Sequence, residues 1–122
     1  PRFYVRYHGL KHYVGAYDHA TSKSFKEFVA WHAKIIAKEK GLREPVKGPI
    51  SISLTFQMGE NGQERFHTKR PDLDNLTKPI LDGMRGIIYH DDSQIVEAHL
   101  IKQYGEPMVI VEVKTLNGDM HA

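Results

Sequence analysis

The sequence contains no cysteine, which excludes a disulfide framework, a cysteine-ligated zinc site and thiol catalysis. It has no apolar run near the roughly 18 residues that a membrane-spanning helix needs, and it shows no signal peptide. Internal repeats, low-complexity tracts and linkers rich in glycine, serine and proline are also absent. With 122 residues, of which 40% are hydrophobic and 26% charged, we expect one folded domain over residues 1–122, located in the cytoplasm.

The net charge is only +2, but the two signs are unevenly distributed along the chain. Residues 1–70 hold 13 lysines and arginines against 6 acidic residues, whereas residues 71–122 hold 4 against 9. A basic segment attracts a polyanion by neutralising its phosphates, and an acidic segment repels one unless its carboxylates hold metal cations. The combination favours a nucleic-acid enzyme with a metal site, although ordinary clustering of surface charge explains it equally well.

Strand periodicity is found at both ends of the chain and in its middle. Residues 2–8 alternate and, with residues 12–17, predict an initial hairpin; residues 50–58 give the clearest strand, with apolar side chains at every second position. Two further strands, predicted over residues 94–104 and 108–115, form a closing pair. The expected fold class is α+β, a single domain with a mixed β-sheet, in the order hairpin, helix, strand, helix, strand, strand.

Two helices are predicted to pack on this sheet. The first begins at a capping box formed by Ser24 and Glu27 and ends before Gly41. The second runs over residues 73–85, and we expect Pro79 to bend or delay its first turn because proline lacks a backbone donor.

Acidic residues gather at the start of the second helix and again after its end. Asp72 precedes this helix and Asp74 lies in its first turn, where two carboxylates can converge and the positive helix terminus favours them. Lys78 follows Asp74 by four residues and so projects beside it. Asp91 and Asp92 would bring a third carboxylate, and since strand neighbours point to opposite faces, we expect only one of them to coordinate.

Oxygen ligands of this kind suit Mg²⁺, which would lower the pKa of a bound water and offset charge on a phosphate. Each piece also has an ordinary structural explanation. Asp72 is a good helix N-cap, and the run Asp91-Asp92-Ser93 is a common turn sequence. Crowding so many carboxylates around one helix stabilises little without a cation, which favours the metal site.

Five basic residues are candidates for holding DNA backbone phosphates, contacts that position DNA without reading its sequence. Two lie in the first strand among aromatic side chains, and three lie at the end of the polar loop that precedes the second helix. They are Arg2, Arg6, Arg65, Lys69 and Arg70.

The run DLDNLTK at residues 72–78, coupled to DDSQ at residues 91–94, resembles the signature of the RusA family of Holliday junction resolvases. The resemblance implies a small Mg²⁺-dependent endonuclease of bacterial or prophage origin that acts on four-way junction DNA as a homodimer. It matches Asp72, Asp74 and Asp92 to the family's essential carboxylates and Lys78 to its important lysine. These four are the expected catalytic residues, and the three aspartates are the expected metal ligands.

Two alternatives stay open at this point. Another Mg²⁺-dependent nuclease, acting on flaps or other branched DNA, has the same chemical requirements. A non-catalytic DNA-binding module is possible if the acidic cluster is only capping and turn chemistry.

Overall fold

The computed structural model describes residues 2–8, 19–60 and 63–116, with side chains over residues 23–60 and 63–116. In chain order the elements are β1 (Arg2–His8), α2 (His19–Glu39), β2 (Ile50–Gly59), α3 (Leu73–Met84), the short 3₁₀ helix η1 (Asp92–Gln94), β3 (Ile95–Gln103) and β4 (Gly105–Thr115). The predicted α+β class is confirmed. No helix in the described part of the chain is long and apolar enough to cross a membrane.

The four strands form one mixed sheet in the order β1-β4-β2-β3. Strand β4 is antiparallel to both β1 and β2, whereas β3 runs parallel to β2. The predicted pairing of the last two strands with each other is therefore wrong, because β2 lies between them. Strand β2 takes the centre because its apolar alternation buries one face completely, while β3, with several exposed side chains, lies at an edge.

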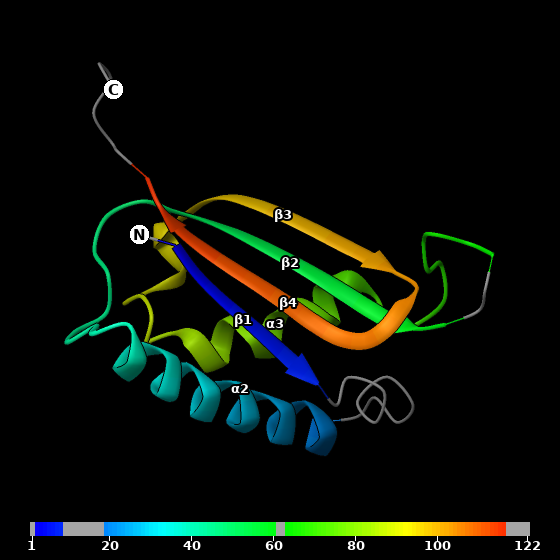
Figure 1. Ribbon diagram of the computed structural model, residues 1–122, viewed down its shortest axis with the longest axis horizontal. Coiled ribbons are helices and arrows are strands. Elements are labelled where there is room, and N and C mark those ends of the chain that lie inside the picture. The colour runs from blue at the N-terminus through cyan, green and yellow to red at the C-terminus, as the bar shows by residue number, and fades with distance from the viewer. Residues whose placement is uncertain (1, 9–18, 61–62, 117–122) are drawn as a thin grey trace.

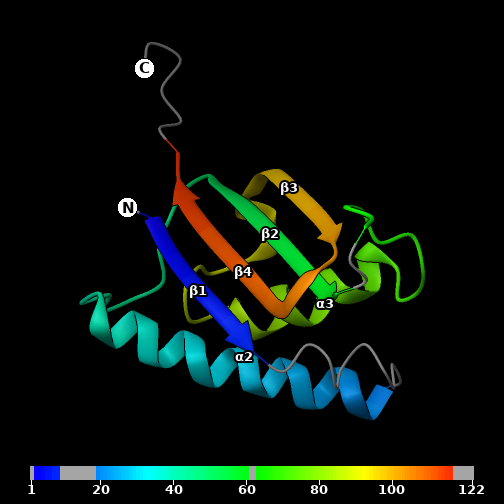
Figure 2. The ribbon, with the colours of Figure 1, turned by 45° about the vertical axis from the view of Figure 1, so that its right-hand side comes forward.

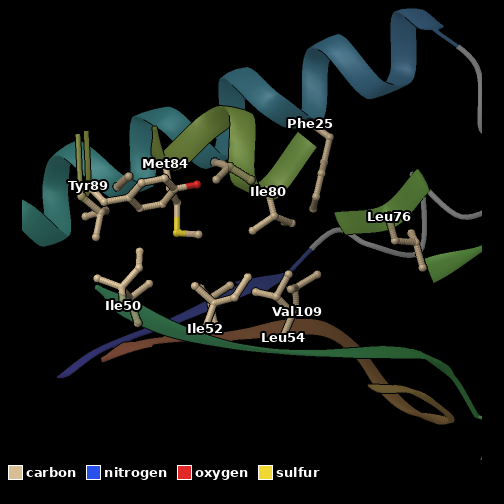
Figure 3. Close-up of a cluster of buried hydrophobic side chains, with 14 of the residues drawn as sticks. Phe25, Ile50, Ile52, Leu54, Leu76, Ile80, Met84, Tyr89 and Val109 are labelled. Atoms are coloured by element: carbon tan, nitrogen blue, oxygen red, sulfur yellow. The ribbon is translucent and has the colours of Figure 1, made fainter. Parts of the chain in front are cut away.

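Both helices cover the same face of the sheet, and no helix of the described residues covers the other face (Figures 1 and 2). The core lies between these two layers and is lined from below by alternate residues of β2 and β4 (Figure 3). On β2 the intervening serines, threonine and glutamine face the open side, where they are partly exposed. The period-two pattern of residues 50–58 therefore fixes which face of the sheet receives the helices.

Helix α2 begins at His19, five residues before the predicted capping box, so Ser24 and Glu27 lie within the helix. The second strand predicted for the hairpin, residues 12–17, lies outside the described residues. Helix α2 ends near Gly41 as predicted, where a φ of 71° suits glycine.

Helix α3 matches its predicted range closely and continues through Pro79, which is buried within it. It packs tightly on α2 at Gly83. A Cβ atom at Gly83 would lie 2.7 Å from Val29 Cγ1 and 2.8 Å from the Lys26 carbonyl oxygen, so only glycine permits this approach. The close packing fixes the axis of the helix whose start carries Asp72 and Asp74.

Candidate active site

The cationic loop, residues 63–71, lies along the free edge of β3. The backbone N–H of Tyr104 donates to the Arg65 carbonyl over 2.8 Å, and the N–H of His67 donates to the Lys102 carbonyl over 3.2 Å. Between these bonds, Phe66 forms an antiparallel bridge with Gln103. The loop therefore extends the sheet beyond β3 for a few residues and then leads directly into α3.

The predicted phosphate-binding residues of this loop are exposed. Arg65, Lys69 and Arg70 all face solvent, and the Arg65 guanidinium lies 4.7 Å from the centre of the exposed Phe66 ring. Arg2 and Arg6 lie on β1, whose side chains are outside the described residues. Of the five predicted phosphate contacts, three are thus exposed on the loop that leads into α3.

Asp72 and Asp74 stand at this start. Asp72 occupies the N-cap position with extended backbone, but its side chain makes no capping hydrogen bond. Both carboxylates are exposed. The N-cap explanation of Asp72 thus lacks the bond that would support it, and the positive end of the helix favours negative charge at this position.

The DDSQ run at residues 91–94 is held by its own polar side chains. Asp91 accepts the Ser93 N–H over 3.1 Å, and this hydrogen bonding lowers the pKa of the Asp91 carboxyl. The Gln94 amide oxygen accepts the N–H groups of His90 and Asp91, at 2.8 and 2.9 Å. Its amide nitrogen donates to the carbonyls of Val46 and Gly48, at 3.0 and 2.9 Å. The side chains of Asp91 and Gln94 therefore stabilise the backbone of this turn, and Asp92 remains as the candidate metal ligand.

Both carboxylate oxygens of Asp92 have hydrogen-bond partners. The Arg85 guanidinium lies 3.1 Å from Oδ2, and the Tyr89 hydroxyl lies 2.9 Å from Oδ1. The same hydroxyl is 3.0 Å from the Leu81 carbonyl oxygen. Burial raises the pKa of Tyr89 well above its usual value, and the hydrogen bond and negative charge of Asp92 add to this shift. The phenol thus stays protonated and available as a donor.

The two acidic sites lie at opposite ends of α3. Arg85 follows Asp72 by thirteen positions, which corresponds to roughly 20 Å along a helix that rises about 1.5 Å per residue. Among the described residues, no group of three or more His, Asp or Glu side chains lies close enough to hold a metal ion. The described part of a single chain therefore does not bring Asp72, Asp74 and Asp92 together into one group.

Lys78 projects from the exposed side of α3 between these ends. Its ammonium lies 3.7 Å from Asp82 Oδ2, and Arg85 lies 3.6 Å from Asp82 Oδ1. The exposed side of α3 thus carries alternating charges along its length, in the order Asp74, Lys78, Asp82 and Arg85.

Sequence reasoning missed three side chains that shape these sites. Tyr89 and Arg85 hold Asp92, and Lys102 holds the cationic loop. Arg85 and Asp92 are close in the sequence, so their contact could have been considered. Lys102 is about thirty positions from the loop residues that it binds, and no local pattern reveals that β3 lies beside this loop.

The chain belongs to the RusA endodeoxyribonuclease family, because the family model described as "Endodeoxyribonuclease RusA" matches residues 2–114. It is 31% identical over 116 residues to the uncharacterized protein YqaN of Bacillus subtilis (strain 168), covering 82% of this chain and 78% of that protein. It is 44% identical over 52 residues to the crossover junction endodeoxyribonuclease rusA of Lactococcus phage r1t. That second alignment covers 39% of this chain and 40% of the phage protein.

Proposed function

We propose that this chain is a Mg²⁺-dependent, structure-specific endodeoxyribonuclease that resolves Holliday junctions by paired symmetric nicks during DNA recombination and repair. The observation that carries the proposal is membership of the RusA family over residues 2–114. An exposed pair of carboxylates beside an exposed cationic loop supports it, since this arrangement suits a phosphodiester substrate. The protein would act in the cytoplasm of a bacterium, on chromosomal or prophage DNA.

We assign Asp72, Asp74 and Asp92 as metal ligands and Lys78 as the cation that stabilises charge on the scissile phosphate. The Lys78 side chain is 78% exposed, and its ion pair with Asp82 spans 3.7 Å. An ion pair whose ammonium is this exposed contributes little, about 0–1 kcal/mol, so Lys78 can exchange Asp82 for a phosphate oxygen. Arg2, Arg6, Arg65, Lys69 and Arg70 would hold the DNA backbone.

A homodimer would overcome the separation of the carboxylates. Two copies of α3 placed side by side and antiparallel would set Asp92 of one copy near Asp72 and Asp74 of the other. The alternating charges of the exposed α3 side support this arrangement. Reversed, the order acid, base, acid, base becomes base, acid, base, acid, so that Asp74 would face the second copy's Arg85 and Lys78 would face its Asp82.

Such a two-fold pair would contain two equivalent sites, as paired nicks in a four-way junction require. The same antiparallel arrangement would therefore account for both the charge pattern of α3 and the number of cuts. Each site would then depend on residues of both copies.

The test uses a supercoiled plasmid that extrudes a cruciform, incubated with and without Mg²⁺. The wild-type protein should linearise it only with Mg²⁺, whereas Asp74→Asn and Asp92→Asn should each bind junction DNA normally and cut nothing. Mixed and allowed to exchange subunits, these two variants should regain nicking in one strand, because one of the two shared sites is then free of both substitutions. If the mixture stays inactive although dimers containing one copy of each variant have formed, the shared site is refuted.

Comparison of substrates separates the alternatives. Cutting of flaps in preference to four-way junctions would favour a different branched-DNA nuclease. Binding of junctions without cutting under any divalent metal would favour a DNA-binding module, and the nuclease proposal would then be abandoned.

A further inference from the structure

Lys102 connects the edge strand β3 to the cationic loop through its side chain. Its ammonium donates to the carbonyl oxygen of Lys69 over 2.6 Å and to that of Pro71 over 2.8 Å. These two carbonyls flank Arg70, and the second belongs to the residue directly before Asp72. A charged donor forms stronger hydrogen bonds than a neutral one, so these contacts are among the firmest that the loop makes.

The position of Lys102 in the sheet explains why it reaches the loop. Lys102 is paired with Phe56 of β2, which is fully buried on the side of the sheet that faces the helices. An edge strand can carry a long side chain on that side because its alkyl stem packs along apolar surface while its charged end emerges. On β3 the ammonium emerges where the loop passes toward α3.

The backbone contacts hold only the first part of the loop. Arg65, Phe66 and His67 are attached to β3 by main-chain pairing. Beyond His67, the two bonds from Lys102 are the hydrogen bonds that the structure shows between the sheet and residues 68–71, while Pro71 is also buried. The segment that carries Lys69 and Arg70 is therefore hydrogen-bonded to the sheet through this one side chain.

We infer that Lys102 is a positioning residue that fixes the phosphate-binding segment Lys69–Arg70 and the entry of the chain into Asp72. What the segment binds rests on the proposed function, whereas its attachment by Lys102 does not. Two of the three ammonium hydrogens are directed at the carbonyls, so Lys102 acts through the loop and does not itself contact DNA. Because the cations are already fixed in the free protein, less conformational entropy is lost when DNA binds.

The test measures amide hydrogen exchange and junction binding for Lys102→Met, which keeps the length of the stem and removes the donors. The N–H of His67, which donates to the Lys102 carbonyl, should lose protection by about tenfold, since the loop detaches more often. Junction affinity, measured without divalent metal, should fall by about tenfold with the salt dependence unchanged, because the number of phosphate contacts stays the same. Lys102→Arg should restore much of both.

Two control variants distinguish positioning from other roles. Lys69→Met should leave loop protection unchanged and lower the slope of log affinity against log salt by about 0.9, as expected for a direct phosphate contact. Val111→Ala, in the buried core of β4, should lower overall stability without selective loss of loop protection.

The outcomes separate this inference from the proposed function. Loop protection within twofold of wild type in Lys102→Met would overturn the inference, whatever the protein does to DNA. A salt slope reduced as in Lys69→Met would also overturn it, because Lys102 would then be a phosphate contact. If Lys102→Met loses loop protection but the wild-type protein binds no junction, the attachment by Lys102 is supported and the proposed function is refuted.

Discussion

Replacing Tyr89 with phenylalanine removes one hydroxyl and leaves the buried ring in place, and the structure sets the cost. The Tyr89 side chain is 0% exposed, and its hydroxyl lies between the Leu81 carbonyl and Asp92 (Figure 3 shows the ring in the core). The hydroxyl has one proton, so the substitution removes one good hydrogen bond and not two. The Leu81 carbonyl keeps the N–H of Arg85 as a partner, at 3.0 Å, and is not left unpaired.

A hydrogen bond to a charged group contributes about 1.5–3 kcal/mol, and the partial exposure of Asp92 places this one at the lower end. We expect Tyr89→Phe to lose about 1.5 kcal/mol of unfolding free energy, or roughly 4–8 °C in Tm. Urea unfolding measures the change, with an unaltered m-value as the sign of an intact native state. Thr77→Val is the matched control, because the buried Thr77 hydroxyl has no partner in the described part of the chain and its removal should cost nothing.

A loss below about 0.5 kcal/mol for Tyr89→Phe would show that the hydroxyl does not hold Asp92 in solution. An equal loss in Thr77→Val would show that the assay reports hydroxyl deletion in general. Either result would contradict the claim that the Tyr89 hydroxyl holds the Asp92 carboxylate in place.

Two further predictions concern packing and pH. Gly83→Ala should destabilise the protein by about 1–3 kcal/mol despite the better helix propensity of alanine, because its Cβ would lie 2.7 Å from Val29 Cγ1; thermal unfolding measures this, and a gain in Tm would contradict it. Burial and the nearby Lys102 charge lower the pKa of His67 below its usual 6.5, so the unfolded chain binds this proton more readily. Stability should therefore fall as the pH decreases from about 6.5 through the lowered pKa, and His67→Phe should lose this part of the pH dependence in urea unfolding at a series of pH values.

The helices and strands were largely predictable because their signals are local. The alternation in residues 50–58 and the range of the second helix each depend on a single element, and both are confirmed. The start of α2 was misplaced because the spacing of Ser24 and Glu27, which is typical of a capping box, also occurs inside a helix that begins earlier. Strand order was not predictable, since short connections favour pairing of neighbours, and here β2 separates β3 from β4.

The candidate site was predictable in its residue types and not in its geometry. The spacing of Asp72, Asp74 and Lys78 is a local property, and the structure places Asp72 at the N-cap of α3, Asp74 in its first turn and Lys78 one turn further on. Asp92 depends on how the chain returns after α3, and it returns at the far end of that helix. No periodicity carries this information, because it is set by Tyr89 entering the core and by Gln94 joining residues 46 and 48 to the same turn.

The DDSQ run shows why a motif can be dense in polar residues while contributing one side chain to chemistry. Asp91 is engaged as the cap of η1, and all four hydrogen-bonding positions of the Gln94 amide are filled by backbone groups. These bonds fix the backbone on both sides of Asp92, while Arg85 and Tyr89 fix its carboxylate. These contacts hold the Asp92 carboxylate at the end of α3 opposite Asp72 and Asp74, so a site that included all three would need the other two carboxylates from elsewhere. If these aspartates act together, as proposed, a second copy of the chain is the direct way to supply them.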